Sequence, residues 1–450
     1  MSTLFEIKFI LFSLLIILYS CTSGTEPTPE TALESYLNNR DRTYSWEFYE
    51  TKEMGGATFY NLLLTSQEWR DYIWRHQLAV IVPDTFEYDG ALLFINGGSN
   101  SEEMPNWKDS DDRTLQAVGS LALENNAIVA MIFQVPNQPL FGDLTEDEII
   151  SLTFHNFLND NDYTWPLLFP MVKSVTRAMD AIQDFSTEIL HHDVGWFLVA
   201  GASKRGWTTW LTGASDDRVI AIAPMVIDML NMPESIAYHL EAWGDYSPQI
   251  ADYVELGVAQ EVNTPEGEKV VAMVDPYSYR DKLDMPKLIF NGTNDPYWPV
   301  DVIKHYLDGI PGENYLHYVP NAGHGLGDRK QAFQALGSFF SETLQGVDYP
   351  ACSWELKESD EAIQVIIEAT REKLQGAVLW MADSDDRDFR DNEFKSSVIE
   401  IGLSDRITAT MEYPESGYRA FYIDLLYSDP HGDIYSKSTR VFVTDEDKVL

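Results

Sequence analysis

The sequence predicts an α/β fold with a mostly parallel sheet, followed by a small all-β sandwich domain. Through most of the chain, short apolar runs without polar alternation are separated by segments of helical periodicity. Strands that alternate with helices in this way form a parallel sheet covered on both faces. From about Pro350 the pattern changes to short strands with turns between them, which is typical of a sandwich. We therefore expect an α/β domain at 35–349 and a β-sandwich at 350–450.

The composition indicates an ordered globular protein with a strongly acidic surface. Its 450 residues suffice for two domains, and 44% of them are hydrophobic and 13% aromatic. The 72 acidic and 31 basic residues give a formal net charge of −41. Such a surface repels nucleic acid and anionic lipid headgroups, so we expect no nucleic-acid partner.

The N-terminal segment is typical of an exported protein. Lys8 precedes an apolar run at 9–19, which is too short to span a bilayer and has the length of a signal-peptide core. The run leads into Cys21 in a sequence that resembles a bacterial lipoprotein box, so lipid at this cysteine is the one membrane anchor we expect. We predict a lipoprotein-like signal peptide at 1–21 and a Ser/Thr/Pro/Glu-rich tether at 22–34. The protein would be periplasmic or attached to the outer membrane or cell surface if lipidated, and otherwise secreted.

The elements of the α/β domain follow from the hydrophobic period. Apolar runs predict strands, and apolar residues repeated every three or four positions predict helices, as Leu168, Met171 and Val172 do on one helix face. The predicted strands are 57–64, 78–83, 91–95, 127–133, 196–200, 219–227, 287–291 and 315–319, and the predicted helices are 112–125, 168–189 and 329–344.

One segment of the α/β domain does not fit the alternation. Residues 229–284 form a longer stretch than a simple connection needs, and the stretch carries Tyr238, Trp243 and Tyr253. We expect a mostly helical lid over the active end of the sheet. The alternative is a structural excursion that packs its own aromatic side chains.

The sandwich is predicted from short strands, some of which alternate clearly between apolar and polar residues. The run from Ile407 to Met411 is the plainest case, because Ile, Ala and Met alternate there with threonines. The predicted strands are 360–368, 377–381, 397–401, 407–412, 419–426 and 439–443.

A candidate nucleophile, Ser203, lies where a predicted buried strand gives way to a predicted helix. A serine between small residues at such a sharp turn is how α/β-hydrolases expose their nucleophile. Gly201 and Ala202 keep large side chains out of the turn, and Gly206 allows the helix to approach the strand closely. The spacing is G-x-S-x-x-G where the commoner motif is G-x-S-x-G, so strand–turn–helix geometry is the test of the motif. A plain loop is the alternative.

A general base and a carboxylate follow Ser203 in the chain order of α/β-hydrolases. Asp295 comes directly after the strand at 287–291, in a turn rich in Gly, Asn and Pro, and His324 lies between glycines after the next strand. A serine nucleophile needs such a base and a carboxylate to orient it. We therefore predict a Ser203–His324–Asp295 triad, with Asp228, at the end of an earlier strand, as the alternative acid.

Two segments are candidates for stabilising an oxyanion. The backbone N–H of Lys204 directly follows the nucleophile, and Gly97 and Gly98 follow the strand at 91–95 in a sequence that resembles the glycine-rich loop of esterases. A simple turn is the alternative reading of the glycines. The side chains of Lys204 and Arg205 could meet an anionic substrate or pair with local acids.

No cofactor or metal is expected. The acidic string 383–388 lacks the glycine and closing glutamate of an EF-hand, and Arg387 stands where an oxygen ligand is needed. Cys21 and Cys352 are the two cysteines of the chain, too few for a cysteine-based metal site.

Several strings of the chain are long enough to be specific, and they are Leu64–Trp69, Trp165–Leu168 with Met171–Lys173, Gly201–Trp207, Val226–Asn231 and Asn291–Asp295. With these strings the chain resembles the PhoPQ-activated pathogenicity-related protein family. The resemblance runs from about residue 35 to the β domain and implies an exported α/β-hydrolase-like protein. The turn at Ser203, with a basic residue after the serine, is also similar to that of glucuronoyl esterases, which bears on reaction type alone.

The function predicted from these observations is hydrolysis of an ester or amide, on a small molecule or linked to a polymer. Ser203 would attack the carbonyl and His324 would act as base and then as acid. The alternative from a different class is a non-catalytic secreted or surface factor that uses the same fold for binding or signalling.

Overall fold

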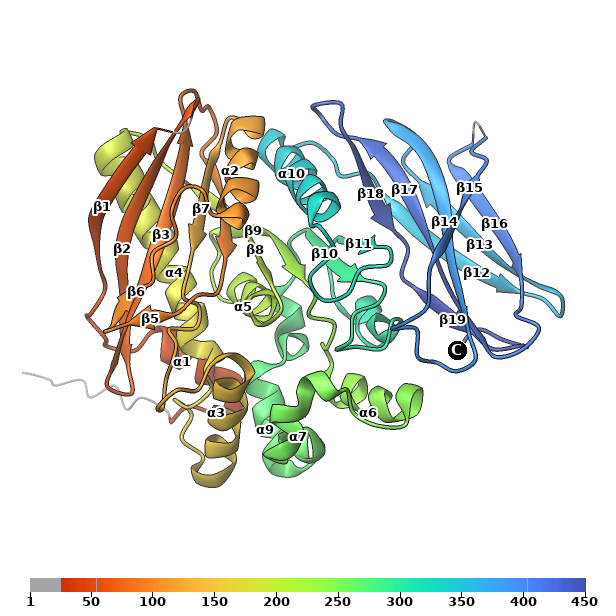
Figure 1. The fold of residues 1–450 in the computed structure, drawn as a ribbon, viewed down its shortest axis with the longest axis horizontal. Helices are drawn as coiled ribbons and strands as arrows, with labels where there is room; N and C mark the ends of the chain where they lie inside the picture. The colour runs from red at the N-terminus through yellow and green to blue at the C-terminus, as the bar shows by residue number, and fades with distance from the viewer. Residues whose placement is uncertain (1–25, 54, 403) are drawn as a thin grey trace, which may run out of the picture.

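A mixed sheet of 14 strands runs through the whole molecule (Figure 1). The computed structural model describes residues 26–53, 55–402 and 404–450. The strand order is β1-β2-β3-β7-β4-β8-β9-β10-β11-β18-β17-β14-β15, and β19 pairs with β17. The strands from the first part of the chain are β1 (Ser45–Glu53), β2 (Ala57–Trp69), β3 (Tyr72–Pro83), β4 (Gly90–Ile95), β7 (Ile128–Ile132), β8 (Trp196–Ala202), β9 (Val219–Met225), β10 (Lys287–Gly292) and β11 (Asn314–Val319).

The centre of this sheet is parallel. Strands β7, β4, β8, β9, β10 and β11 pair in parallel, and β1, β2 and β3 add an antiparallel edge. Successive residues of β4 alternate between two hydrophobic cores, with Leu93 on one side and Leu92 and Phe94 on the other. The sheet is therefore buried on both faces, as its apolar runs predict.

Helices cover the two faces of the parallel region. Buried residues of α2 (Arg113–Asn125) and α10 (Lys330–Gln345) belong to one core, and those of α1 (Ala32–Leu37), α4 (Leu168–Phe185) and α5 (Lys204–Gly213) belong to the other. This arrangement confirms the predicted α/β fold with a mostly parallel sheet. A π-helical turn, η2 (Ser186–Leu190), continues the second face after α4.

The structure corrects the predicted tether at 22–34. Residues from 29 onward form η1 (Pro29–Thr31) and α1, and Ala32, Leu33 and Tyr36 are buried. These side chains share a helical face that packs on α4, and the Tyr36 hydroxyl donates to Gln67 Oε1 at 2.7 Å. The α/β domain thus begins before residue 35. The predicted signal peptide at 1–21, including Cys21, lies outside the described residues.

The segment predicted as a lid is helical throughout most of its length. It comprises α6 (Met232–Trp243), η3 (Pro248–Ile250), α7 (Ala251–Glu255), α8 (Val258–Glu261), α9 (Pro265–Val274) and η4 (Pro276–Lys282). A helix that the sequence analysis missed, α3 (Glu146–Asp160), gathers with α6, α7 and α9 at one end of the molecule (Figure 1). The Thr145–Glu148 capping box at its start was the signal that could have revealed it.

The C-terminal region consists of antiparallel strands, as predicted. One sheet contains β12 (Cys352–Glu358), β13 (Ala362–Ala369) and β16 (Arg406–Glu412). The remaining strands are β14 (Leu374–Ser384), β15 (Lys395–Ile399), β17 (Tyr418–Ser428), β18 (Ile434–Ser438) and β19 (Phe442–Thr444). Strand β18 lies beside β11, with Leu316 opposite Ser438, so this second sheet of the sandwich continues the main sheet. It thereby covers the edge that β11 would otherwise expose.

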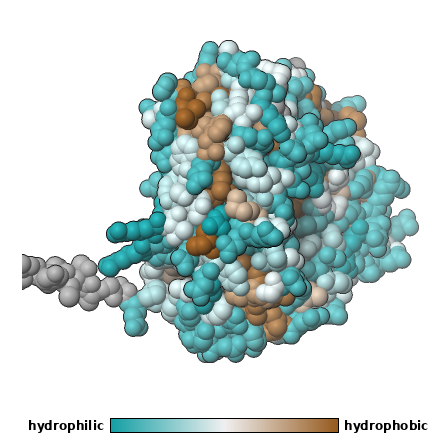
Figure 2. Space-filling view, turned by 60° about the vertical axis from the view of Figure 1, so that its left-hand side comes forward, coloured by the Kyte–Doolittle hydropathy of each residue, from teal (hydrophilic) through white to brown (hydrophobic). Residues whose placement is uncertain are grey.

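The face of the molecule in Figure 2 is mostly hydrophilic, with apolar patches in a few places. Two exposed aromatic residues of β1, Phe48 and Tyr49, are among the apolar side chains of the surface. Of the helices in the described ranges, none has both the length and the apolar character needed to cross a membrane.

Candidate active site

Ser203 occupies a strained turn between β8 and α5. Its φ and ψ are 60° and −128°, a conformation that residues other than glycine rarely adopt. The Ser203 N–H donates to the Met225 carbonyl at 2.8 Å, which fixes the turn against β9. This is the strand–turn–helix geometry that the motif requires.

The two glycines of the motif are needed for close approach. A Cβ on Gly201 would lie 2.7 Å from the Arg205 carbonyl oxygen, and one on Gly206 would lie 2.8 Å from that of Met225. Both contacts are with backbone, which cannot move aside without opening the turn. The sequence therefore places glycines at the two positions where the turn around Ser203 has no room for a side chain.

The structure brings Ser203, His324 and Asp295 together. His324 Nε2 lies 2.9 Å from Ser203 Oγ, and its Nδ1 lies 2.8 Å from Asp295 Oδ2. With the proton on Nδ1, the ring donates to the carboxylate and its Nε2 accepts from the serine hydroxyl. Each residue comes from a different loop after a parallel strand, so the carboxyl ends of β8, β10 and β11 create the site.

Tyr297 contacts both Asp295 and His324 and holds them in place. Its backbone N–H donates to Asp295 Oδ1 at 2.9 Å, and its ring stacks on His324 with centroids 4.1 Å apart. Asp295 is 7% exposed, so these contacts hold its carboxylate away from bulk water. The turn after β10 therefore orients the acid and the imidazole together.

Asp228, the alternative acid, has other partners. Tyr306 donates its hydroxyl proton to Asp228 Oδ1, and Asn291 Nδ2 donates to Oδ2 at 3.0 Å. Burial raises the pKa of Asp228 to about 8, with the Tyr306 hydrogen bond acting in the opposite direction. The structure therefore brings Asp295, rather than Asp228, to the histidine.

The predicted oxyanion donors differ in their surroundings. The backbone N–H of Lys204 begins α5, where the first N–H groups of a helix have no intrahelical acceptor. The Gly97 N–H, by contrast, donates to Asn96 Oδ1 at 2.9 Å. The Gly98 carbonyl accepts from Gln138 Nε2 at 2.9 Å, which fixes the same loop. Asn96, the first residue of this glycine-rich loop, lines the cavity that contains Ser203.

The side chains of Lys204 and Arg205 pair with local acids. Arg205 binds both carboxylate oxygens of Glu146 at 2.7 Å, and Lys204 Nζ lies 3.0 Å from Glu146 and from Asp147. Although burial opposes ionisation, the arginine and lysine lower the pKa of Glu146 to about 2. These pairs attach the start of α3 to α5, and Glu146 has no sequence signal that points to this role.

Two cavities meet at Ser203 and His324. The first, about 50 Å³, lies beneath the lid and is lined mainly by apolar side chains, among them Trp207, Ile250 and Val258. The second, about 270 Å³, lies on the side of Asn96 and Arg329. A substrate carbonyl at Ser203 would thus have an apolar recess on one side and a wider, more polar space on the other.

Across the described ranges, no three His, Cys, Asp or Glu side chains are grouped as metal ligands would be. His317, a histidine of β11, is buried and lies 3.1 Å from the Ser436 carbonyl oxygen through its Nδ1.

Comparison with known proteins gives a family match and a similar fold. The family model of the PhoPQ-activated pathogenicity-related proteins matches residues 33–390. Autocrine proliferation repressor protein A of Dictyostelium discoideum is 30% identical over 469 residues, which cover 96% of this chain and 92% of that protein.

Acetyl xylan esterase 1 from a Thermoanaerobacterium species aligns with a TM-score of 0.50 at 18% identity, covering 71% of this chain and 96% of that one. An acetyl xylan esterase from Paenibacillus sp. R4 aligns with a TM-score of 0.47 at 12% identity, covering 69% and 92%. At such identities the likeness bears on the fold alone, and the first alignment confirms an α/β-hydrolase type.

Proposed function

Because the chain belongs to the PhoPQ-activated pathogenicity-related protein family and has an α/β-hydrolase fold, we propose that it is a serine hydrolase acting on an ester or amide. The observation that carries the proposal is the hydrogen-bonded series from Ser203 Oγ through His324 to Asp295 Oδ2. A strained nucleophile, an imidazole within hydrogen-bond distance and a buried carboxylate make up a nucleophilic triad.

In the proposed reaction, Ser203 Oγ attacks the substrate carbonyl and its proton passes to His324 Nε2. Asp295 stabilises the resulting imidazolium, and Tyr297 keeps the ring in place by stacking. The backbone N–H of Lys204, at the first residue of α5, is the proposed oxyanion donor. His324 then protonates the leaving oxygen or nitrogen, and water repeats the sequence to release the acid and regenerate Ser203.

We assign the acyl group of the substrate to the apolar cavity beneath the lid. Its wall is formed by Trp207 of α5, Ile250 of the lid and Trp298, which follows the triad acid. A cavity of about 50 Å³ favours a short acyl group such as acetyl or propionyl.

Labelling with a fluorophosphonate tests the nucleophile. The wild-type protein should become covalently modified on Ser203, as located by peptide mass spectrometry, because the probe reacts with serines activated by a base. Ser203→Ala should show no labelling while keeping the wild-type melting temperature within about 1 °C, a shift of roughly 1 kcal/mol for a chain of 450 residues.

The control for this labelling is Ser66→Ala. Ser66 also hydrogen-bonds a histidine, His76, at 3.0 Å, but both residues are fully buried in the core. That variant should label like wild type if it folds. A folded wild-type protein that takes up no label would count against a hydrolase.

The name of the Dictyostelium relative supports one second candidate. That protein is called an autocrine proliferation repressor, and the similarity covers 96% of this chain. Under this candidate the chain is a secreted factor that binds a partner without turnover. It predicts that Ser203→Ala retains the full biological effect of the wild type, whereas the hydrolase proposal predicts its loss.

We also propose that the protein is exported, on the basis of the leader-like sequence at 1–21. Expression in a bacterial host should yield protein that begins at Cys21, with a mass increase from attached lipid, in the membrane fraction. Mass spectrometry of the N-terminal peptide measures this. Soluble protein with an unmodified cysteine would indicate simple secretion, and an intact Met1 in cytosolic protein would contradict export.

A further inference from the structure

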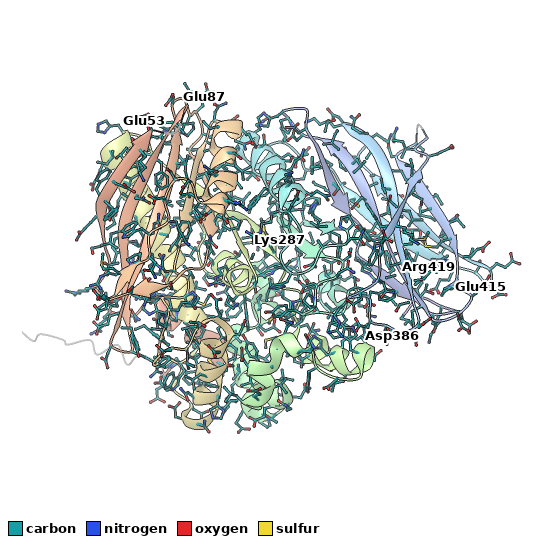
Figure 3. The ribbon with its side chains drawn as sticks, in the orientation of Figure 1. Glu53, Glu87, Lys287, Asp386, Glu415 and Arg419 are labelled. Carbon is teal, nitrogen blue, oxygen red and sulfur yellow. The ribbon has the colours of Figure 1, made fainter. Side chains whose placement is uncertain are left out.

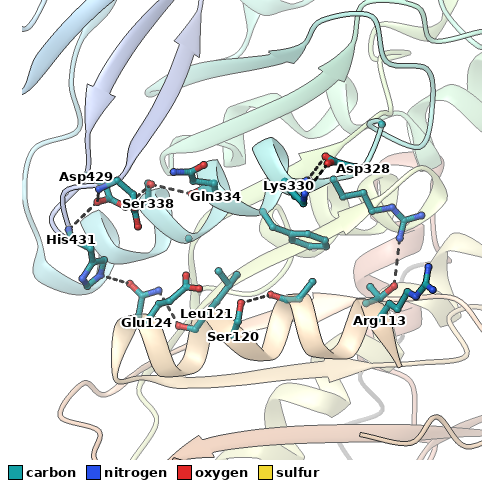
Figure 4. A pocket seen from close by; sticks show the side chains of 18 residues that line it. Arg113, Ser120, Leu121, Glu124, Asp328, Lys330, Gln334, Ser338, Asp429 and His431 are labelled. Atoms are coloured by element: carbon teal, nitrogen blue, oxygen red, sulfur yellow. Dashed lines mark hydrogen bonds and ion pairs between the residues drawn. The ribbon is translucent and has the colours of Figure 1, made fainter. Parts of the chain in front are cut away.

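A long open groove adjoins the cavity that contains Ser203. The groove has a volume of about 820 Å³ and lies between α2 and α10 (Figure 4). Thr114, Arg329 and Phe333 line both the groove and the cavity at the nucleophile. The two spaces are therefore continuous, and a substrate bound at Ser203 can extend into the groove.

The end of the groove next to the active site is positively charged. Arg113 and Lys330 lie there at the first residues of α2 and α10 (Figure 4), and Arg329 directly precedes Lys330. Lys330 pairs with Asp328 at 3.4 Å. Arg329 Nη1 lies 3.4 Å from Thr114 Oγ1, and neither Arg113 nor Arg329 forms an ion pair with any residue that the structure describes.

These two arginines are not placed where they would stabilise the helices. Cations are unfavourable in the first turn of a helix, where the backbone dipole is positive. Arg113 occupies such a position, and Arg329 is the residue that caps α10. In a chain with 72 acidic and 31 basic residues, two arginines without a carboxylate partner in this groove, one of them also lining the cavity at the nucleophile, are better explained by a ligand.

The rest of the groove has both polar and apolar walls. Helix α2 has 13 residues, so the groove beside it is about 20 Å long at 1.5 Å per residue. Its walls include Ser120, Gln334 and Ser338 as well as Leu121 and Phe333. Its far end is acidic and is formed by Glu124 of α2 with Asp429, His431 and Asp433 of the turn between β17 and β18, most of which are labelled in Figure 4. The C-terminal domain thus contributes one end of the groove.

We propose that this groove binds the leaving-group side of the substrate, a chain bearing a carboxylate that Arg113 and Arg329 recognise. The proposal rests on the proposed hydrolase function, because the acyl group then fills the lid cavity and the remainder of the substrate leaves on the opposite side. Guanidinium groups bind carboxylates through paired hydrogen bonds, which gives both affinity and direction.

A matched pair of acetate esters tests this assignment: 3-acetoxybenzoate and 3-acetoxybenzamide, which differ in charge and little in size. The wild type should hydrolyse the carboxylate ester with a kcat/KM about tenfold higher. Arg113→Gln should lower this ratio several-fold, and Arg113→Gln with Arg329→Gln should abolish the preference. Raising the NaCl concentration should also reduce the ratio, since salt screens exposed charges.

Lys395→Gln is the control, because it removes the same charge from an exposed position on β15, away from the groove. It should leave the ratio unchanged. An unchanged ratio in the arginine variants, or a wild type that treats the two esters alike, would overturn the groove assignment and leave the hydrolase proposal intact.

A binding measurement tests the reverse case, in which the groove assignment is right and the hydrolase proposal is wrong. Calorimetry with the Ser203→Ala protein should show tighter binding of 3-acetoxybenzoate than of 3-acetoxybenzamide, with the difference lost in the double arginine variant. That result combined with no hydrolysis by the wild type would contradict the proposed function while supporting the groove.

An independent observation concerns the loop at 385–394, between β14 and β15. Asn294, the residue before the proposed catalytic acid, donates through Nδ2 to the carbonyl oxygens of Phe389, Arg390 and Asn392 at 3.0, 3.1 and 2.8 Å. One asparagine side chain thus joins the turn that carries Asp295 to the C-terminal domain.

The same loop also contacts the segment that carries His324. Asn321 Nδ2 donates to the Phe394 carbonyl at 3.0 Å, and the Phe394 N–H donates to Asn321 Oδ1 at 2.7 Å. The Asn294 N–H donates to the Ala322 carbonyl at 3.0 Å, so the acid and histidine segments are joined to each other as well.

The loop is itself held in shape by its charges. Arg390 binds Asp388 at 2.8 Å, and Arg387 contacts Tyr238 and Glu241 of the lid helix α6. Asp386 of the loop lies close to α6 in Figure 3. The acidic string at 383–388 therefore belongs to a structured contact between the C-terminal domain, the lid and the triad loops.

We also infer that Asn294 and Asn321 are positioning residues through which the C-terminal domain sets the distance between Asp295 and His324. This inference rests on the proposed function, since it concerns the geometry of the proposed triad. Misplacement of reacting groups by about 1 Å can cost roughly 100-fold in rate.

Asn294→Ala should lower kcat 10- to 100-fold, with KM for an ester substrate changed less than twofold and the fluorophosphonate labelling rate reduced in parallel. The downfield proton resonance of His324 Nδ1 should weaken or shift, a readout that needs no turnover.

Tyr435→Phe is the matched control. It removes a buried hydrogen bond of 2.6 Å between the C-terminal domain and Glu342 of α10, far along the chain from the triad loops. It should lower the melting temperature while leaving kcat and the resonance unchanged. Equal losses of kcat in both variants, or no loss in Asn294→Ala, would overturn the positioning role. If the wild type shows no turnover, but the His324 resonance still weakens or shifts in Asn294→Ala, the result would contradict the hydrolase proposal and leave the positioning role intact.

Discussion

Asp228 and Asp295 are both buried carboxyl groups that follow parallel strands, yet their partners give them different chemistry. Asp295 accepts from His324 and from the Tyr297 N–H, so its charge is compensated by two donors. Asp228 accepts from Tyr306 and Asn291, and burial raises its pKa to about 8. At neutral pH Asp228 is therefore mostly protonated, and a neutral carboxyl cannot stabilise an imidazolium.

Replacing each acid by its amide separates the two roles. Asp295→Asn should lower kcat by three to four orders of magnitude, as the equivalent change does in a serine protease, because the amide favours the wrong histidine tautomer. Asp228→Asn should lower kcat less than about fivefold. Steady-state kinetics on one ester substrate measures both. A larger loss at Asp228 would move the acid to the end of β9, and small losses at both would mean that the triad is misassigned.

The residues of the proposed triad could be predicted from sequence because each follows a strand whose apolar run is easy to recognise. Ser203, Asp295 and His324 also have small or turn-forming neighbours, which mark sharp loops. The Arg205–Glu146 pair could not be predicted in this way, because its partners are 59 positions apart and each is an ordinary surface residue by type.

At the scale of elements, local periodicity predicted the parallel strands and the long helices, whereas elements without a clear apolar period were missed. Strand β1 has mostly exposed residues and owes its place to pairing with β2. Helix α1 overlaps the predicted polar tether, because its six residues are too few to show the apolar repeat of a helix. The position of β18 beside β11 depends on residues 316 and 438, a contact that no local pattern reports.

Under the proposed function the residues that line the cavity beneath the lid limit the length of the acyl group, which gives a prediction about specificity. Ile250→Ala should enlarge the cavity beneath the lid, since Ile250 is 4% exposed and lines it. The ratio of kcat/KM for p-nitrophenyl butyrate to that for p-nitrophenyl acetate should rise about tenfold, because one or two methylenes in an apolar pocket are worth about 1–3 kcal/mol. The same change should cost about 2–4 kcal/mol in stability.

Ile220→Ala is the control for the lid variant. Ile220 lies on β9 and is 39% exposed, away from the residues that line the lid cavity. It should leave the chain-length preference unchanged. An Ile250→Ala variant that keeps the wild-type preference would show that the acyl group lies elsewhere.

At the scale of the whole molecule, buried carboxyl groups and buried histidines have opposite effects on how the free energy of unfolding changes with pH. Burial raises the pKa of Asp228 to about 8 and those of Asp275 and Asp424 to about 7. Such carboxyls stay protonated in the folded state above the pH at which they ionise in the unfolded chain, about 3.9, so stability falls as pH rises from there to the folded pKa.

Three buried histidines make stability change with pH in the opposite direction, over a lower pH range. Burial lowers the pKa values of His76, His239 and His317 to about 4, so the unfolded chain binds more protons than the folded one between about pH 4 and 6.5. Stability contributed by these histidines rises with pH over that range. The histidine and carboxyl effects therefore nearly cancel below about pH 6.5. Above it the carboxyls dominate, although burial also lowers the pKa values of Lys287 and Lys437 to about 8, which adds stability as the pH approaches 8.

The free energy of unfolding should therefore be nearly constant between pH 5 and 6.5 and fall by about 1 kcal/mol between pH 6.5 and 8. Each protonated carboxyl lowers it by up to roughly 1.4 kcal/mol per pH unit, and the histidines and the two lysines offset part of that fall. Urea titrations at fixed ionic strength measure this. Asp228→Asn should abolish the fall, because the amide cannot ionise. Asp308→Asn, which changes an exposed carboxyl, should leave the slope as in wild type. Stability that stays level or rises from pH 6.5 to 8 would mean that the buried carboxyls ionise at their ordinary pKa values, and Asp228 would then carry a charge beside the triad.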